Sequence, residues 1–152
     1  SSSANIKIPG NVNIGIKEKK SRLRFFHQTY HNNLHEFIKK KKENYEEILL
    51  VSIHSFTRRF DKIQRGIEIG LLWNKNMNLL IPIQKKLNDQ YILYGRNYPY
   101  SGFHFNYTLD RHSNNGEIDN ICIEFRNDLI CSEKTIKKYI QIFSEIFLGL
   151  IK

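Results

Sequence analysis

The feature that most constrains the fold is an apolar run that ends in a histidine, LLVSIHSFTRRF at residues 49–60. Its first half has the nearly continuous apolar character of a strand buried in an α/β sheet. His54 and the two residues after it then lie at the carboxyl end of that strand. Because ligands of open α/β sheets bind outside the carboxyl ends of strands, His54 is the histidine with the best functional prospects.

A second segment, DNICIEFRNDLI at residues 119–130, shows the same design. Apolar residues alternate there with Glu124, Arg126 and Asp128, which is the period of a strand that ends in polar groups. Two strands thus bring a possible metal ligand and a possible acid or base to one edge. A plainer alternative stays open, because Glu124 and Arg126 are two apart on one strand and can simply pair with each other.

Length and composition favour one folded domain. A chain of 152 residues with 40% hydrophobic residues is long enough to bury one sizeable core and is not disordered. No apolar run approaches the roughly 20 residues that span a bilayer, and the opening SSSANIKIPGN lacks the apolar core of a secretory signal. We therefore expect a cytoplasmic protein with no membrane partner, and the sequence leaves its oligomeric state open.

The net charge of +9 raises the question of nucleic acid as a partner. The excess is mostly lysine, in runs such as residues 39–42, and aromatic and basic residues are not interleaved on one predicted surface. We do not expect nucleic acid binding. The two cysteines, Cys122 and Cys131, form neither a disulfide framework nor a zinc-binding set.

Hydrophobic periodicity predicts the remaining elements. Residues 17–43 have a helical apolar stripe to bury, and His27, His31 and His35 form a second stripe on it, typical of a polar flank or of a metal pair, with the flank favoured. We predict strands over 67–73 and 91–94, a helix over 78–88 with Pro82 in its first turn, and a closing helix capped by Ser132. Residues 95–118 have no sustained period, which is typical of a binding loop.

This alternation of helices and strands predicts the α/β class, with a mixed or mostly parallel sheet flanked by helices. Residues 1–16 are polar and have a turn signal at 9–11, so they have the character of a loop that enters a fold. We therefore expect the sheet to be truncated at the N-terminal side.

Four sequence blocks, in this order, carry a resemblance to a known family. They are HSFTRRF at 54–60, RGIEIGLLWNKN at 65–76, NYPYSGFHFNYTLDRH at 97–112 and IEFRNDLI at 123–130. The chain resembles the N-formylglutamate amidohydrolase family, zinc-dependent enzymes of the phosphorylase/hydrolase-like fold group that includes carboxypeptidase A and aspartoacylase. The resemblance implies one amidohydrolase-like domain over residues 1–152, with zinc as cofactor and a small acidic acyl-amino acid as substrate.

The resemblance also implies roles for single residues. His54 matches a zinc ligand, Glu124 matches the acidic residue that acts on the metal-bound water, and Arg126 matches an arginine that holds the substrate carboxylate. Further substrate-binding candidates are Asn97, Tyr100 and His112 in the loop, together with Arg65 and Arg22.

The chain departs from the family pattern at its start. The resemblance places a histidine and an acidic metal ligand in an earlier segment, which this sequence does not contain, and a catalytic zinc normally has three protein ligands. His27 and His31 are the substitutes to consider. Two hypotheses follow: a zinc-dependent hydrolase of a formyl or acyl amide on an acidic amino acid, or a noncatalytic remnant or fragment that binds a small anionic ligand.

Overall fold

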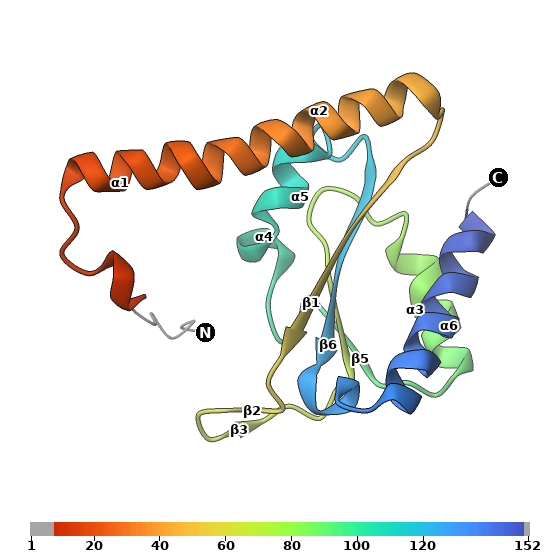
Figure 1. Ribbon diagram of the computed structural model, residues 1–152. Helices are drawn as coiled ribbons and strands as arrows, with labels where there is room; N and C mark the ends of the chain where they lie inside the picture. Colours follow the sequence, from red (N-terminus) through yellow and green to blue (C-terminus); the bar gives the residue numbers. More distant parts are fainter. Residues whose placement is uncertain (1–7, 151–152) are drawn as a thin grey trace. The chain divides into compact units, whose positions relative to one another are not determined.

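The computed structural model describes residues 8–150, which belong to two compact units that divide after Asn44. The first unit is one long helical rod preceded by a short 3-10 turn, η1 (Pro9–Asn11). The rod consists of α1 (Ile16–Arg22), a π-helical stretch η2 (Leu23–Gln28) and α2 (Thr29–Asn44), coloured red to orange in Figure 1. The helix predicted over 17–43 is confirmed, and the π-helical stretch in it was not foreseen.

The expectation that this helix buries a regular apolar stripe is wrong for most of the stripe. Phe26, Tyr30 and Phe37 are exposed. The physical reason is that, among the described residues of the first unit, only the short segment before α1 lies outside the rod, so they provide no second layer to cover most of the stripe.

The second unit is built on a four-stranded sheet with the order β1-β6-β4-β5. Its strands are β1 (Leu49–Phe56), β4 (Ile69–Leu72), β5 (Tyr94–Arg96) and β6 (Asp119–Arg126). β1 pairs with β6 and β4 with β5 in parallel, whereas β4 and β6 are antiparallel. A small ribbon of β2 (Arg59–Phe60) and β3 (Ile63–Gln64) follows β1. The predicted class, an α/β fold with a mixed, mostly parallel sheet and flanking helices, is confirmed.

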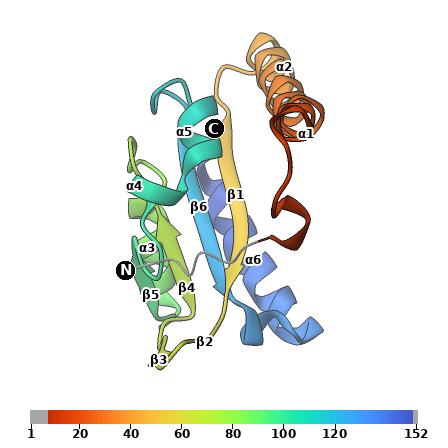
Figure 2. The ribbon, with the colours of Figure 1, turned by 90° about the vertical axis from the view of Figure 1, so that its left-hand side faces the viewer.

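Helices cover the two faces of this sheet differently (Figures 1 and 2). The long helices α3 (Leu80–Asp89) and α6 (Glu133–Leu150) pack on one face and close the main apolar core with Ile69, Leu71, Ile121 and Ile123. The short helices α4 (Gly102–Phe105) and α5 (Tyr107–His112) lie on the other face, where Leu109 packs on Leu72 and Cys122. The second face therefore has a much smaller apolar cluster and more room for polar groups.

Several local predictions hold because local chemistry decides them. Pro82 lies in the first turn of α3, where its missing N–H costs no hydrogen bond. Ser132 precedes α6, and its Oγ accepts a hydrogen bond from the N–H of Thr135 at 3.3 Å. The strand predicted over 67–73 is β4.

Three boundaries differ from the predictions. Tyr91 has a φ of 55° and lies in a turn, so the strand predicted over 91–94 starts only at Tyr94. Residues 95–118 contain α4 and α5 instead of an irregular loop, because helices of four to six residues are too short to show a period. Residues 127–130, predicted as strand, form a 3-10 turn, η3 (Asn127–Ile130).

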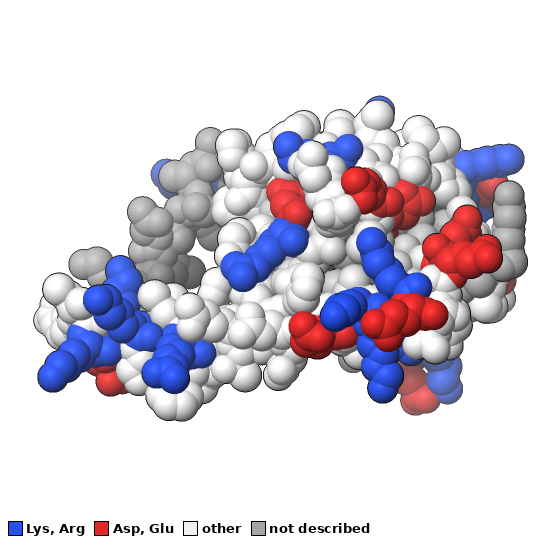
Figure 3. All heavy atoms as spheres, turned by 90° about the horizontal axis from the view of Figure 1, so that it is seen from above, with Lys and Arg blue, Asp and Glu red and all other residues white. Residues whose placement is uncertain are grey.

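No helix within residues 8–150 combines the length and the apolar character needed to cross a bilayer. On the face drawn in Figure 3, Lys and Arg side chains lie in separate groups, with Asp and Glu side chains among them. Cytoplasmic location and the absence of a nucleic-acid partner stay predictions.

Candidate active site

The register of the two longest strands creates the site. Parallel pairing sets His54 on β1 directly opposite Glu124 on β6, and Ser52 opposite Cys122. Alternate residues of a strand point to the same face, so these four side chains share the face that carries α4 and α5. The structure thus brings together the histidine and the carboxyl group that the two strand patterns single out.

A glycine lets a loop cross the sheet beside this pair. Gly70 on β4 is the register partner of Glu124, and a Cβ at Gly70 would lie 2.7 Å from the carbonyl oxygen of Tyr98. No larger residue fits there unless the backbone around the cis peptide between Tyr98 and Pro99 moves away. The close approach brings the following residue, Tyr100, to the edge of the site.

Asn97 holds this loop in shape. Its backbone has a φ of 47°, which asparagine tolerates better than most residues. Its side-chain Oδ1 accepts hydrogen bonds from the backbone N–H groups of Trp73 at 3.0 Å and of Gly102 at 2.9 Å. The side chain predicted to bind substrate is therefore used as a brace between the loop and the end of β4.

The face of β1 and β6 opens into a cavity of about 480 Å³. α4, α5 and the turn between them form its opposite wall. The residues that line it include His54, Tyr100, Phe105, Asn106, Cys122 and Glu124. A cavity of this size admits a small molecule of about amino-acid size.

Glu124 is the most unusual group in this cavity. Its side chain is 7% exposed, and its Oε2 has no hydrogen-bond partner among the described residues. Burial raises the pKa of the Glu124 carboxyl group, and the charges of His54 and Arg65 offset part of this shift. A buried carboxylate with an unused oxygen and a raised pKa is suited to take and return a proton.

Arg65 supplies a buried positive charge near Glu124. It is 6% exposed and stacks on the rings of Phe56, Phe60 and Tyr100, with its guanidinium carbon 5.8, 5.1 and 5.1 Å from the ring centroids. Its Nη1 donates to the carbonyl oxygen of Thr57 and to the Tyr100 hydroxyl, both at 3.3 Å. Within residues 8–150 it forms no ion pair with a carboxylate. Arg65 itself does not line the cavity, but Tyr100, on which it stacks, does.

Arg126 is placed differently. Its Nε forms an ion pair with Asp128 at 2.8 Å, and its Nη1 donates to the carbonyl oxygens of Gly66 and Ile67 at 3.2 and 3.1 Å. It does not line the cavity and does not pair with Glu124, so the plain pairing of those two residues is not what the structure has. Arg126 fastens the segment before β4 to the end of β6.

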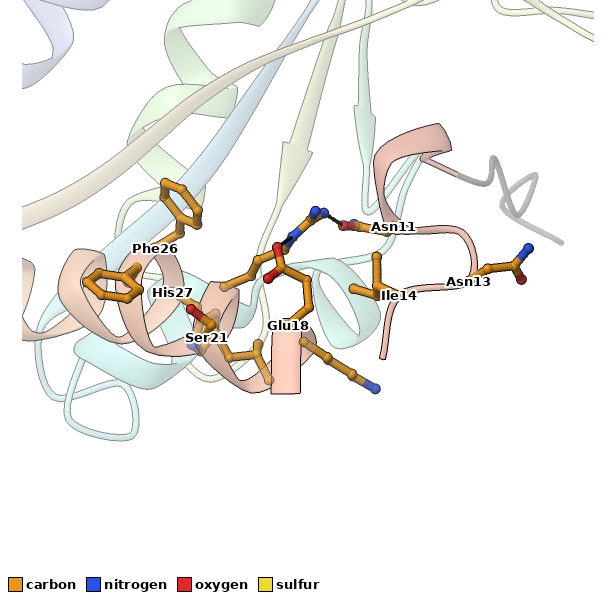
Figure 4. Close-up of a pocket in the computed structure, with 11 residues that line it drawn as sticks. Asn11, Asn13, Ile14, Glu18, Ser21, Phe26 and His27 are labelled. Carbon is orange, nitrogen blue, oxygen red and sulfur yellow. Dashed lines mark hydrogen bonds and ion pairs between the residues drawn. The ribbon is translucent and has the colours of Figure 1, made fainter. Parts of the chain in front are cut away.

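The other predicted residues lie outside the cavity wall. His112 is buried at the end of α5. In the first unit, Arg22 forms an ion pair with Glu18 at 2.8 Å and donates to Oδ1 of Asn11 at 2.7 Å, beside an open hollow of about 1070 Å³ (Figure 4). Its guanidinium group is already used within the unit.

Zinc needs more donors than this cavity offers. Among the residues that the structure describes, no three His, Cys, Asp or Glu side chains come together to hold a metal ion. Burial raises the pKa of Cys122 to about 12, so its thiol stays protonated at neutral pH. His27 and His31 pack ring to ring in the first unit, with centroids 4.4 Å apart. The described residues therefore do not complete a catalytic zinc site of three protein ligands.

Sequence reasoning missed Asn106 and the pair of Ser52 and Cys122. The pair could have been found, because its members precede His54 and Glu124 by two residues on the same strands. Asn106 gave no signal, since its place in the wall depends on the turn between two very short helices.

The fold and the site together define an α/β protein with a partly polar cavity on one face of its sheet. A family model described as N-formylglutamate amidohydrolase matches residues 6–131. The chain belongs to the N-formylglutamate amidohydrolase family, as the four sequence blocks predicted.

Solved structures agree on the fold. The chain is similar to a gene product of Agrobacterium tumefaciens, with a TM-score of 0.84, 26% identity and coverage of 95% of this chain and 59% of that one. It is also similar to N-formylglutamate amidohydrolase from Ralstonia eutropha, with a TM-score of 0.61, 16% identity and coverage of 88% and 51%. The chain thus spans between half and three-fifths of these structures. A search of curated proteins gives no significant match.

Proposed function

We propose that this chain carries the site of an amide hydrolase that acts on N-formylglutamate or a closely similar acyl-amino acid. Family membership supports the reaction class. The observation that carries the proposal is the buried Glu124, whose Oε2 has no hydrogen-bond partner among the described residues. The positive charge of the buried Arg65 is close enough to lower the pKa of this carboxyl group. One group is suited to proton transfer and the other to a substrate carboxylate.

In this mechanism Arg65 binds a carboxylate of the substrate and orients the formyl amide toward Glu124. Glu124 takes a proton from a water molecule, whose oxygen adds to the formyl carbon. Glu124 then returns the proton to the amide nitrogen as the C–N bond breaks. The products are formate and the free amino acid, and Glu124 ends the cycle in its starting state.

We also propose zinc as the cofactor, with His54 as a ligand, because the family resemblance assigns His54 that place. Its position at the mouth of the Glu124 cavity supports the assignment. Within residues 8–150, no group of three donors completes the site around His54.

The alternative function is a noncatalytic protein that binds a small anion. The specific observation in its favour is that Arg65 is buried without a carboxylate partner within residues 8–150, while no group of three metal donors is found there. Such a protein would keep the anion site and lack turnover.

Formate release separates the two functions. The purified chain, with zinc added, is incubated with N-formyl-L-glutamate and, as a comparison, N-formyl-L-leucine. The proposal expects formate from the acidic substrate at a higher rate than from the neutral one. Binding of N-formyl-L-glutamate without formate release favours the anion-binding alternative, and neither binding nor release contradicts both.

A further inference from the structure

A second polar group in the cavity wall lacks a partner. The side chain of Asn106 is 4% exposed, and its Nδ2 has no hydrogen-bond partner among the described residues. A buried amide without a hydrogen-bond partner destabilises the fold, so such groups are rare unless a ligand or a water molecule completes them. A ligand bound in the cavity would explain the missing hydrogen-bond partner of the Asn106 side chain.

The position of Asn106 in the chain makes this more specific. It stands between α4 and α5, at the N-cap of α5, where asparagine side chains usually accept a hydrogen bond from the first turn of the helix. Here the side chain makes no capping hydrogen bond, and only the backbone oxygen is used, by the N–H of Asp110 at 2.9 Å. The local structure leaves the side-chain amide nitrogen without a hydrogen bond, although Asn106 is one of the residues that line the cavity.

Asn106 lines the same cavity as Glu124, whose Oε2 is also without a partner. Two residues that line the cavity thus contain an unpartnered buried donor and an unpartnered buried acceptor. An amide group matches this pair, because it has a carbonyl oxygen to accept and an N–H to donate. A free carboxylate has only acceptors, and Glu124 would repel it.

We propose that the side-chain amide of Asn106 binds the acyl carbonyl oxygen of the substrate, opposite Glu124. This inference rests on the proposed function and deepens it. Asn106 then holds the oxygen on which negative charge develops as water adds to the acyl carbon. It also distinguishes an acylated amino acid from the free one, which has no carbonyl oxygen at this position.

The test compares Asn106→Ala, Asn106→Asp and the exposed control Asn88→Ala with the wild-type chain. We expect kcat/KM for N-formyl-L-glutamate to fall about 100-fold in both Asn106 variants, which is typical for the loss of one donor to a developing oxyanion. Inhibition by L-glutamate, which lacks the acyl group, stays at the wild-type level. The control keeps wild-type activity.

Thermal unfolding provides the structural readout. Removing a buried amide that has no partner does not lower the Tm, so Asn106→Ala unfolds at or above the wild-type temperature. A large drop in Tm for both Asn106 variants would assign Asn106 a structural role and overturn the inference.

The outcomes separate this inference from the proposed function. If the wild type releases formate and both Asn106 variants do so equally well, the function holds and the inference is wrong. If the wild type binds N-formyl-L-glutamate through Asn106 but releases no formate, the inference holds and the function is wrong. If the wild type neither binds nor hydrolyses it, both are wrong.

Discussion

Glu124 lies in a buried environment that destabilises its ionised form. Because burial raises the pKa of its carboxyl group, the folded chain holds this proton more tightly than the unfolded chain does. This tighter proton binding stabilises the folded chain. The stabilisation is fully present below the ordinary carboxyl pKa of 4.5 and is lost as the pH rises through the pKa of Glu124 in the folded chain. At neutral pH the ionised side chain therefore works against folding.

This sign gives a prediction for Glu124→Gln in metal-free buffer with chelator. Glutamine does not titrate, so the variant has a higher Tm than the wild type at pH 7, by about 3 °C, and the gain disappears below pH 4.5. Thermal unfolding followed across this pH range measures it. A variant less stable than the wild type at pH 7 would mean that the carboxylate is a structural group.

Arg65 and Arg126 differ in what they are free to bind. Arg65→Lys keeps the charge but loses the planar fork and its stacking on Phe56, Phe60 and Tyr100. We expect it to weaken binding of N-formyl-L-glutamate about tenfold or more. Arg126→Lys is the matched control, because Asp128 and two carbonyl oxygens already occupy that side chain.

Binding of N-formyl-L-glutamate, measured by calorimetry on both variants, decides between the two arginines. The account expects Arg126→Lys to lower the Tm and leave the affinity unchanged. The reverse result, with affinity lost in Arg126→Lys and kept in Arg65→Lys, would show that Arg126, and not Arg65, binds the carboxylate of the substrate.

At the scale of elements, the approach of the Tyr98 loop to β4 depends on one missing Cβ. Gly70→Ala would place a methyl group 2.7 Å from a backbone oxygen and 3.2 Å from Cβ of Glu124. We expect this variant to lose about 2 kcal/mol of unfolding free energy and most of its activity, since Tyr100 moves with the loop. Gly66→Ala is the control, because a Cβ there meets nothing within 4 Å.

Urea unfolding of the two glycine variants measures the difference. Equal midpoints for Gly70→Ala and Gly66→Ala would show that the loop does not need the close approach. The close approach of Gly70 and Tyr98 would then not explain why Tyr100 lies at the edge of the cavity.

The periodicity of apolar residues predicts the long helices and strands well, because one face of each must be apolar to pack on the core. The apolar run of β6 and the helical repeat of α6 each face a buried core, and their period is visible in the sequence. The strand predicted at β1 is confirmed, but the expectation that it is buried is wrong, because β1 is an edge strand of the sheet and its Ile53 is exposed. α4, α5 and β5 are too short to show a period, so their ends depend on the tertiary contacts of the 95–118 segment. The regular stripe of the first helix predicted a buried face, yet Phe26 and Phe37 are exposed.

Part of the candidate site was likewise predictable from the sequence. His54 and Glu124 follow from the period of two strands and their shared register, so the sequence pattern was enough to bring them together. The difference between Arg65 and Arg126 was not predictable, because it depends on whether a carboxylate lies within reach. Asn106 was missed since its role depends on the absence of a local cap.

At the level of the whole chain, the proposed cofactor leads to a prediction about metal content. We predict that the purified chain binds zinc through His54, with the metal content falling to background in His54→Ala. The exposed His104→Ala is the matched control and keeps the wild-type content. Elemental analysis after zinc loading and buffer exchange measures this, and equal zinc in the wild type and His54→Ala would contradict the assignment.

The proposed function requires Glu124 to move the proton in hydrolysis. The most direct test is to measure binding of N-formyl-L-glutamate and formate release for the wild type and Glu124→Gln under identical zinc-loaded conditions. The account predicts that the variant binds N-formyl-L-glutamate but releases formate at least about 1000-fold more slowly than the wild type. Formate release by Glu124→Gln at a rate near that of the wild type would contradict it.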